Sequence, residues 1–295
     1  MHDPFHRGER AIQERTGERD TALRNGRLIS DRIPAAAASF VVQQHYCALG
    51  WASPGGELWA SLLAGPPGFA RTDQNRQTLY LRPGDDAGTP ARMSPMAAMR
   101  EGDHLSVLLI DFATRRRLRV NGRVERCEEV EIVLAIDQAY PQCPKYIRSS
   151  QHGGRVSDPP ALVIREGETL SDDLIEWIRG ADTFFVASAH PDGPADVSHR
   201  GGRPGFVKFK DGVLRIPDYA GNAMFSTLGN FALNPRAGLV FVDFESDRRL
   251  QMTGDVRLDL EAAEPDGEIG CTDRWWEFTP RKWVVSPLNK VTPRG

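Results

Sequence analysis

The residues best suited to chemistry are arginines set among glycines in the second half of the chain. Residues 198–206 read Ser-His-Arg-Gly-Gly-Arg-Pro-Gly-Phe. Glycine has no Cβ, so its backbone N–H groups can approach an anion closely, and an arginine beside it can donate two hydrogen bonds to phosphate oxygens. The run is typical of an anion-binding loop, although a purely structural turn has the same composition.

Two further runs in the second half have the same character. Residues 217–222, Pro-Asp-Tyr-Ala-Gly-Asn, lead into an expected helix over 223–233, whose first N–H groups would favour a phosphate. Arg248 and Arg249 fall inside an expected strand, where alternation points one of them toward the barrel or a partner surface. A solvated strand edge explains paired arginines equally well. The order of the three runs in one half favours a joint role.

Most of the chain is a tandem duplication. Residues 59–69 recur as 196–206, residues 109–118 recur as 241–250, and Gly122 and Gly254 close the two copies. Two matches in the same order, about half the chain length apart, indicate a pair of complete domains rather than an array of short units.

The elements that must position these residues are mainly strands. Short β-branched and aromatic segments separated by Pro-Gly turns, with one helix in each copy, predict a mainly β fold made of two small antiparallel barrels. The expected strands are 46–51, 57–63, 78–81, 105–111, 117–123 and 129–135 in the first copy, and 183–189, 195–199, 206–208, 213–216, 237–244 and 249–258 in the second. Helices are expected over 94–100 and after Ser171, where Leu174, Ile175 and Ile178 share one face.

The expected boundaries follow from this pattern. Residues 1–35 form an N-terminal helical segment, laid as a solvated helix pair on the first domain. Residues 36–150 form the first barrel, residues 151–160 a linker rich in glycine and proline, and residues 161–295 the second barrel.

Composition excludes several classes of function. Hydrophobic residues make up 40% and charged residues 26%, as in a soluble globular protein. A net charge of −3 gives no attraction to nucleic acid or anionic membranes. No apolar run approaches the roughly 20 residues of a membrane span, and the N-terminus has no signal-peptide core. The four cysteines lie far apart, so we expect a cytoplasmic protein with reduced thiols and no metal site.

The second copy resembles the pyridoxamine 5′-phosphate oxidase-related branch of the FMN-binding split-barrel proteins. The resemblance runs over residues 182–258, through Asp-Val-Ser-His-Arg-Gly-Gly, Ile-Pro-Asp-Tyr-Ala-Gly-Asn, Leu-Gly-Asn, Asn-Pro-Arg and Arg-Arg-Leu-Gln-Met-Thr-Gly. The first copy is similar to the accompanying half of tandem members. The resemblance implies two tandem FMN-binding split β-barrels, with FMN at the junction of two barrels. That junction would lie within one chain or between two chains of a homodimer.

The resemblance also implies which residues would hold FMN. Arg200 and Gly201 would lie at the phosphate, Ile216 and Pro217 beside the isoalloxazine ring, and Arg249 toward the flavin. Lys208 would lie near the phosphate or ribityl chain, and Asn222 stands where many members have a phosphate-binding arginine or lysine. No catalytic residue is assigned.

The first copy departs from this pattern. It is expected to carry Ala64 in place of Arg200 and Pro90 in place of Asn222, although Arg116 and Arg117 are retained. The first barrel is therefore interpreted as a degenerate, structural partner. If the barrels pair, the Cys143–Tyr146 segment would reach the flavin of the second copy, but an ordinary turn is the simpler reading.

The expected function is that of an FMN-dependent oxidoreductase acting on a small molecule. The alternative is a non-catalytic barrel that carries flavin or haem. Pyridoxal phosphate synthesis is disfavoured, since residues 275–283 match the substrate-binding region of the true oxidases only loosely.

Overall fold

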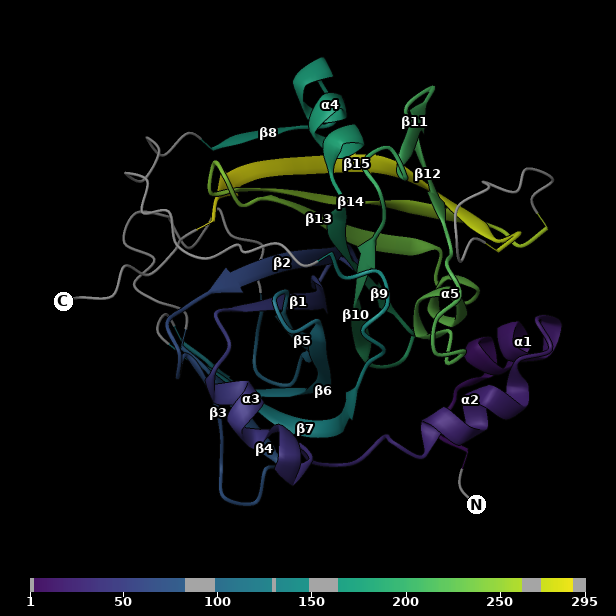
Figure 1. The fold of residues 1–295 in the computed structure, drawn as a ribbon. Coiled ribbons are helices and arrows are strands. Elements are labelled where there is room, and N and C mark those ends of the chain that lie inside the picture. The colour runs from purple at the N-terminus through teal and green to yellow at the C-terminus, as the bar shows by residue number, and fades with distance from the viewer. Residues whose placement is uncertain (1–2, 83–98, 129–130, 149–163, 262–271, 289–295) are drawn as a thin grey trace.

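Two antiparallel sheets dominate the computed structural model, which describes residues 3–82, 99–128, 131–148, 164–261 and 272–288 (Figure 1). The expected helix over 94–100, the 151–160 linker, Pro90 and Cys271 fall wholly or partly outside these residues. The first sheet contains β1 (Tyr46–Ala52), β2 (Leu58–Ala64), β3 (Ala70–Thr72), β4 (Thr78–Leu81), β5 (His104–Asp111), β6 (Arg116–Cys127) and β7 (Ile132–Pro141). The second contains β8 (Arg165–Gly167), β9 (Thr183–Ala189), β10 (Ala195–Gly201), β11 (Lys208–Lys210), β12 (Val213–Pro217), β13 (Arg236–Asp243), β14 (Arg248–Asp259) and β15 (Trp275–Pro287).

The two sheets have the same topology. The strand order is β2-β1-β5-β6-β7-β4-β3 in the first and β10-β9-β13-β14-β15-β12-β11 in the second, with β8 added beside β15. Each of the strands β9–β15 therefore occupies the place of the strand eight positions earlier, and β8 has no counterpart in the first sheet. The expected mainly β fold of two tandem split barrels is confirmed, and the duplication seen in the sequence is a duplication of structure.

The strand register corrects one detail of the comparison between copies. Tyr46 pairs with Ala64 at the end of the β1–β2 ladder, and Thr183 pairs with Gly201 at the end of the β9–β10 ladder. Ala64 therefore corresponds to Gly201, and Leu63 is the residue that corresponds to Arg200. The expectation that Ala64 replaces Arg200 was wrong by one position, since the recurrence of residues 59–69 as 196–206 also aligns Leu63 with Arg200.

Gly122 and Gly254 have the same structural role in the two copies. Both lie at a shift of register, on β6 and on β14. A Cβ on Gly122 would lie 1.9 Å from the carbonyl oxygen of Ala135, and a Cβ on Gly254 would lie 2.2 Å from that of Thr279. Only glycine permits the neighbouring strand to come this close.

The two copies pack face to face within one chain. The shared apolar cluster consists of Ala48, Ala60, Leu62, Leu108, Ile110, Phe112 and Ile147 from the first half and Phe185, Ala187, Val197, Val240 and Leu288 from the second. Backbones approach closely here, since a Cβ on Gly238 would lie 2.5 Å from Cα of Trp59. The hydroxyl of Ser106 also accepts a hydrogen bond from the N–H of Val197 at 2.9 Å. Each half keeps its own larger core besides this contact.

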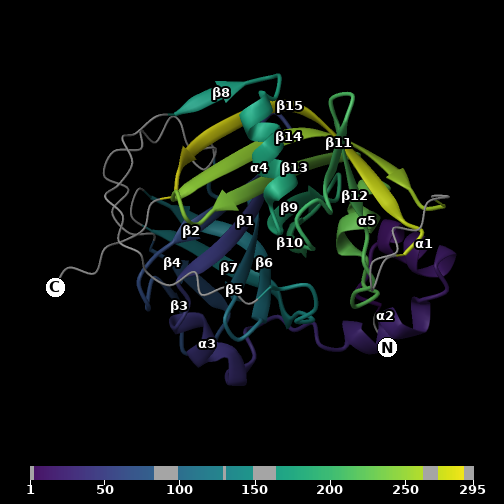
Figure 2. The ribbon, with the colours of Figure 1, turned by 45° about the horizontal axis from the view of Figure 1, so that its top comes forward.

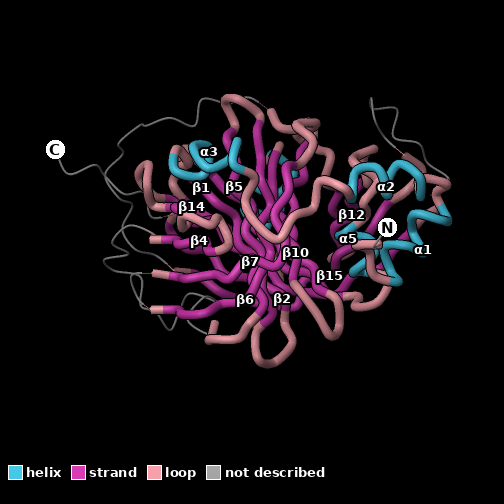
Figure 3. Tube along the Cα trace, turned by 90° about the horizontal axis from the view of Figure 1, so that it is seen from below, coloured by secondary structure: helices cyan, strands magenta, loops and turns pink. Residues whose placement is uncertain are grey.

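Helix α1 (Arg7–Arg15) lies against the second copy, not on the first as the sequence suggested, and α2 (Arg19–Gly26) packs against α1. Figures 1 and 3 show them beside α5 (Ser226–Phe231). The physical reason is a pair of glycines: a Cβ on Gly8 would lie 2.2 Å from the carbonyl oxygen of Gly229. The side chain of Asn25 adds a hydrogen bond to the carbonyl of Asn222 at 2.8 Å.

The remaining helices cover the outer surfaces. The short η1 (Ala35–Ala37) and α3 (Ala38–Val42) pack near β3. The helix expected after Ser171 is α4 (Asp172–Gly180), which buries Leu174 and Ile178 on the side of the second sheet remote from the first copy (Figure 2). None of the helices among the described residues is long and apolar enough to cross a bilayer.

The helix expected from Ala223 begins only at Ser226. Ala223 and Phe225 have φ angles of 61° and 60°, in the left-handed region, which breaks the helical path before that point. The helix has six residues and no side-chain cap. The expected phosphate seat on a helix that begins at Ala223 is therefore not formed.

Candidate functional site

A cavity of about 100 Å³ lies at the junction between the two copies. The first copy contributes β6 and the residues that follow β7, and the second contributes β10 and the loop from β12 to α5. Its charged and polar lining comes from Arg117, Arg119, Gln142, Cys143, Lys145, Ser198, His199, Arg200, Asp218, Asn222, Ser226 and Thr227. The cavity therefore combines side chains that no single barrel holds.

Arg117 enters this cavity from β6 of the first copy. Its Nε donates a hydrogen bond to the carbonyl oxygen of Cys143 at 2.7 Å, and Nη2 donates to the carbonyl of Lys145 at 3.3 Å. Among the described residues it forms no ion pair with a carboxylate. Burial, reinforced by the nearby charges of Arg119 and Arg200, lowers the pKa of Arg117 to about 10. The site thus contains a partly buried positive charge that no carboxylate among the described residues pairs with.

His199 is a neutral, buried neighbour of Arg117. Its Nδ1 lies 3.1 Å from Nη1 of Arg117, and its Nε2 is buried without a hydrogen-bond partner among the described residues. Burial first, and then the charges of Arg117 and Arg200, hold the pKa of His199 well below its usual value. An arginine only donates, so Nδ1 accepts and the single ring proton lies on Nε2.

Arg119 forms the rear wall of the cavity and is almost fully buried, with 2% of its surface exposed. Its Nη1 donates to the hydroxyl of Tyr140 at 3.0 Å and to Oδ1 of Asp196 at 2.9 Å. Its Nη2 donates to the hydroxyl of Ser198. Asp196 also accepts a hydrogen bond from Asn121 at 2.9 Å. The guanidinium of Arg119 is therefore held by groups from both copies.

Arg200 lies on β10, where the alternation of side chains directs it into the cavity. Its Nη2 lies 3.8 Å from Oδ1 of Asp218, and its Nε is buried without a hydrogen-bond partner among the described residues. Asp218 is shared with Arg274, whose Nε donates to the other carboxylate oxygen at 3.1 Å. Burial lowers the pKa of Arg200, opposed by Asp218. Arg200 thus retains hydrogen-bonding capacity that a ligand can use.

Two tyrosines, one from each copy, line the cavity together. The rings of Tyr146 and Tyr219 stack with centroids 5.0 Å apart, and the hydroxyl of Tyr146 donates to the carbonyl of Ala220 at 3.0 Å. Tyr146 has a φ of 64°. A Cβ on Gly201 would lie 2.2 Å from the carbonyl oxygen of Tyr146. Gly201 is therefore needed for the approach of the first copy's segment to β10.

The residues expected at the flavin fall into two groups. Arg200, Gly201, Pro217 and Asn222 all line the cavity. The side chain of Asn222 is engaged locally, since Oδ1 accepts a hydrogen bond from the N–H of Met224 at 3.1 Å.

The other three expected residues lie elsewhere. Ile216 is fully buried in the core of the second copy. Lys208 is exposed, with Nζ 4.9 Å from the ring centre of Trp275. Arg249 joins the two copies, donating to the carbonyl of Leu62 at 2.8 Å and to the hydroxyls of Ser61 and Ser286 at 3.2 and 2.9 Å.

Arg249 and Arg117 are equivalent residues of the duplication. In the strand ladders Arg116 is opposite Asp111 and Arg248 is opposite Asp243, so Arg117 and Arg249 occupy the same position in the two copies. Both side chains contact the other copy. Arg117 meets His199 across the junction, whereas Arg249 meets Ser61 and Leu62, and Leu62 is the equivalent of His199. The cationic cavity is therefore built on one side of the junction, and hydrogen bonds of Arg249 fill the other.

The sequence left two interpretations of the Cys143–Tyr146 segment: an ordinary turn, or a segment that reaches the site of the second copy. In the structure Cys143, Lys145 and Tyr146 line the cavity. Sequence reasoning missed Arg117 and Arg119 as site residues and interpreted His199 as an ordinary strand end. The duplicated Arg-Arg pair was the available signal. It indicates the site only once β6 is known to face β10.

Residues 170–282 match the family model of pyridoxamine 5′-phosphate oxidase. None of the curated proteins matches the chain. Similar solved structures include a putative pyridoxamine 5′-phosphate oxidase from Lactobacillus delbrueckii, at 11% identity and TM-score 0.32 over 39% of this chain and 93% of that one. Another is HutZ, a haem storage protein from Vibrio cholerae, at 13% identity and TM-score 0.28 over 40% and 95%.

A FAD-binding protein from Mesorhizobium loti has 13% identity and TM-score 0.28 over 42% of this chain and 97% of its own. These likenesses are weak, and the family match is the firmer finding. It covers β9 to β14, most of β15 and the cavity-lining residues of the second copy. The resemblance found in the sequence is confirmed over residues 170–282, which match the model of the pyridoxamine 5′-phosphate oxidase family.

Proposed function

We propose that this protein is a flavoprotein that binds one FMN in the cavity between its two barrels and acts as an oxidoreductase on a small molecule. The observation that carries the proposal is the partly buried guanidinium of Arg117, which has no carboxylate partner among the described residues and lines the same cavity as Arg200. A buried charge is costly unless it is matched. An anionic ligand would match it.

The charges of the lining favour a phosphate. Asp196 pairs with Arg119, and Asp218 with Arg200. Arg117 and Lys145 are then left as cations to face a dianion. The unpartnered Nε of Arg200 and the Nε2 proton of His199 add donors of the kind that phosphate oxygens accept. The donor set therefore fits the phosphate end of FMN.

The cavity must widen before it can hold the isoalloxazine ring of FMN. A cavity of about 100 Å³ takes a phosphate group, whereas pockets for larger ligands typically hold ~300–1,000 Å³. The stacked pair Tyr146–Tyr219 lies where the ligand would extend beyond the phosphate. FMN binding then separates these rings, and Pro217 with Tyr219 provides a flat surface for the isoalloxazine.

The roles of the protein residues follow from this placement. Arg117, Arg119 and Arg200 would hold the phosphate, and Asn222 would hold the loop beside it. Lys208, Ile216 and Arg249 are not part of the proposed contact set, because they lie in other surroundings. When bound, FMN would supply the hydride or electron transfer, while the protein binds, orients and shields it.

The first experiment is the visible absorption spectrum of the purified protein, followed by titration with FMN. Arg200→Ala is expected to weaken FMN binding at least about tenfold, since it removes charged hydrogen bonds worth ~1.5–3 kcal/mol. Arg203→Ala, at an exposed position in the same loop, is the matched control and should bind as the wild type does. A protein that neither contains nor takes up FMN would overturn the proposal.

A non-catalytic carrier remains the alternative within the same family. The distinguishing measurement is anaerobic reduction of bound FMN by NADH or NADPH, followed by reoxidation with turnover of an electron acceptor. Tight FMN binding without reduction by either donor would favour the carrier and remove the oxidoreductase part of the proposal.

A further inference from the structure

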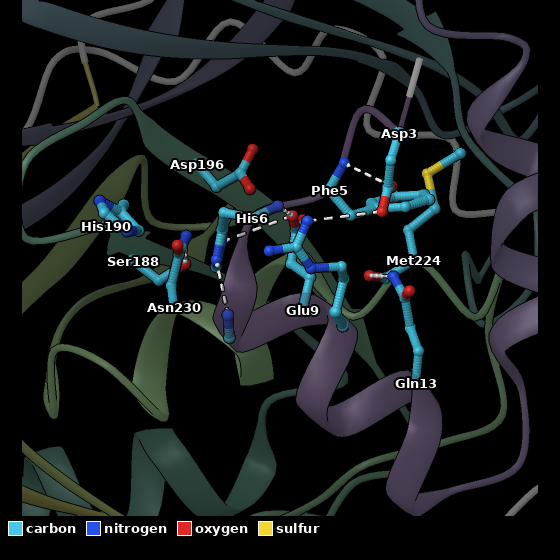
Figure 4. A network of polar contacts seen from close by, with 12 residues as sticks. Asp3, Phe5, His6, Glu9, Gln13, Ser188, His190, Asp196, Met224 and Asn230 are labelled. Atoms are coloured by element: carbon cyan, nitrogen blue, oxygen red, sulfur yellow. Dashed lines mark hydrogen bonds and ion pairs between the residues drawn. The ribbon is translucent and has the colours of Figure 1, made fainter. Parts of the chain in front are cut away.

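Helix α1 is pressed so closely against α5 that a carboxyl group of α1 lies inside the second copy. The contact is made at Gly8 and Gly229, where a Cβ on Gly229 would lie 2.6 Å from the backbone of Glu9. Glu9 therefore cannot turn to solvent, and only 7% of its surface is exposed. Figure 4 shows Glu9 beside His6, with Asp196 of β10 close by.

The surroundings of Glu9 come from several elements. On its own side, its Oε2 accepts a hydrogen bond from the N–H of His6 at 2.9 Å and lies 3.5 Å from Nε2 of the same residue. His190, before β10, packs edge-on against the ring of His6 at 5.0 Å. The charged and titratable groups facing it from the sheets are Asp196 on β10, Arg119 on β6 and Tyr140 on β7.

Asp196 connects Glu9 to the cavity. It is the carboxylate that accepts a hydrogen bond from Arg119 at 2.9 Å, and Arg119 lines the cavity. The N-terminal segment supports Arg119 by a second route, because Phe5 packs in one apolar cluster with Tyr140, whose hydroxyl accepts from Arg119. Two carboxyl groups thus lie behind one cavity arginine.

We propose that Glu9 is a positioning residue of the ligand site, acting on Arg119 through Asp196, and that it keeps its proton while an anion is bound. The proposal rests on the function proposed above. Neutral Glu9 leaves Asp196 as the single negative charge behind Arg119. Ionised Glu9 adds a second negative charge there and reduces the attraction that Arg119 exerts on a phosphate.

The direction of the titration supports this role. Burial, and then repulsion by Asp196, raise the pKa of Glu9 to about 8. An anion in the cavity adds negative charge nearby and raises that pKa further. By linkage, binding then takes up protons near pH 8, and affinity falls as the pH rises through that value.

The test is FMN binding between pH 7 and 9, a range in which the phosphate is a dianion throughout. The wild type is expected to lose about threefold in affinity across this range, a modest effect because charges several ångströms apart interact weakly at an effective dielectric constant near 20. Glu9→Gln, which keeps the shape and removes the titration, should bind with nearly constant affinity. Glu14→Gln, on the exposed face of the same helix, should retain the wild-type pH profile.

Proton uptake by the wild type provides a second test that needs no variant. Calorimetric titration with FMN at pH 8, in two buffers of different ionisation enthalpy, should show uptake of a fraction of a proton for each ligand bound. Zero uptake, or a Glu9→Gln profile that matches the wild type, would overturn the role of Glu9 while leaving FMN binding intact.

A failure of the proposed FMN binding itself can be distinguished from a failure of the role of Glu9. If the wild type does not bind FMN, inorganic phosphate is the next probe of the cavity, measured in the same way against pH after correction for its own titration. Absence of binding for both probes removes the ligand site and this role of Glu9 together.

Discussion

Nη1 of Arg117, in the first copy, lies 3.1 Å from Nδ1 of His199, in the second. The contact fixes the histidine tautomer, because the arginine can only donate. The charge of Arg117 beside the ring also disfavours the protonated form of His199 and, together with burial, lowers its pKa. The proposed anion site needs both residues, so it depends on the first barrel as well as on the second.

Replacement of Arg117 by leucine should separate ligand binding from folding. We expect FMN affinity to fall at least tenfold, while stability without ligand changes by less than about 1 kcal/mol, since loss of hydrogen bonds to two carbonyls is offset by removal of a desolvated charge. Isothermal titration and urea unfolding measure the two effects. Arg116→Leu, at the exposed neighbouring position, is the control. Equal loss of affinity in both variants would contradict a specific role for Arg117.

The stability of the protein should decline in mild acid because of its buried histidines. The pKa of His199 is held below the usual value in the folded state, so an unfolded chain binds the proton first as the pH falls below about 6.5. Stability is complete above that value and is lost below it, by up to about 1.4 kcal/mol per pH unit for each such group.

Urea unfolding at a series of pH values tests this expectation. His199→Gln should flatten the slope between pH 6.5 and 5 without abolishing it, because burial also lowers the pKa of His6 and His104. The exposed His45 offers a matched control, and His45→Gln should keep the wild-type slope. An unchanged slope in the His199 variant would mean that the ring takes up its proton at the same pH in the folded and the unfolded chain, which would contradict a lowered pKa.

Gly201→Ala should disturb the junction although it adds a single methyl group. The new Cβ would meet the carbonyl oxygen of Tyr146 at 2.2 Å, which forces the segment after β7 away from β10. We expect a loss of about 1–3 kcal/mol, as for other overpacked sites, and weaker FMN binding. Gly221→Ala in the same cavity has no neighbour closer than 3.9 Å and should fold as the wild type does. Similar unfolding midpoints for the two variants would contradict this account.

The sequence predicts the fold better than it predicts the site. The duplication and the strands follow from motifs and alternation, because both are local properties of the chain. Of the seven residues that the resemblance implies at the cofactor, four line the cavity. The contribution of Arg117 and the position of Glu9 depend on how two barrels and a helix pack. Neither is encoded within a window of sequence. The glycines Gly8 and Gly229 illustrate the difference, since each is unremarkable alone and only their contact moves α1 onto the second copy.

Arg249 provides the sharpest test between the sequence expectation and the structure. The resemblance places this residue at the flavin, whereas its hydrogen bonds join β14 to the carbonyl of Leu62 and the hydroxyl of Ser61 in the other copy. Arg249→Met should therefore leave these buried acceptors unsatisfied and destabilise the protein by about 2 kcal/mol. FMN affinity at a temperature where the variant is folded should stay within twofold of the wild type.

Arg248→Met is the control for this comparison, since the neighbouring arginine is partly exposed and pairs with Asp243 at 3.0 Å. A surface pair of this kind contributes about 0–1 kcal/mol, so this variant should unfold near the wild-type midpoint. If Arg249→Met instead loses FMN affinity tenfold at unchanged stability, the flavin occupies the Arg249 side of the junction. The cationic cavity around Arg117 would then serve another anion.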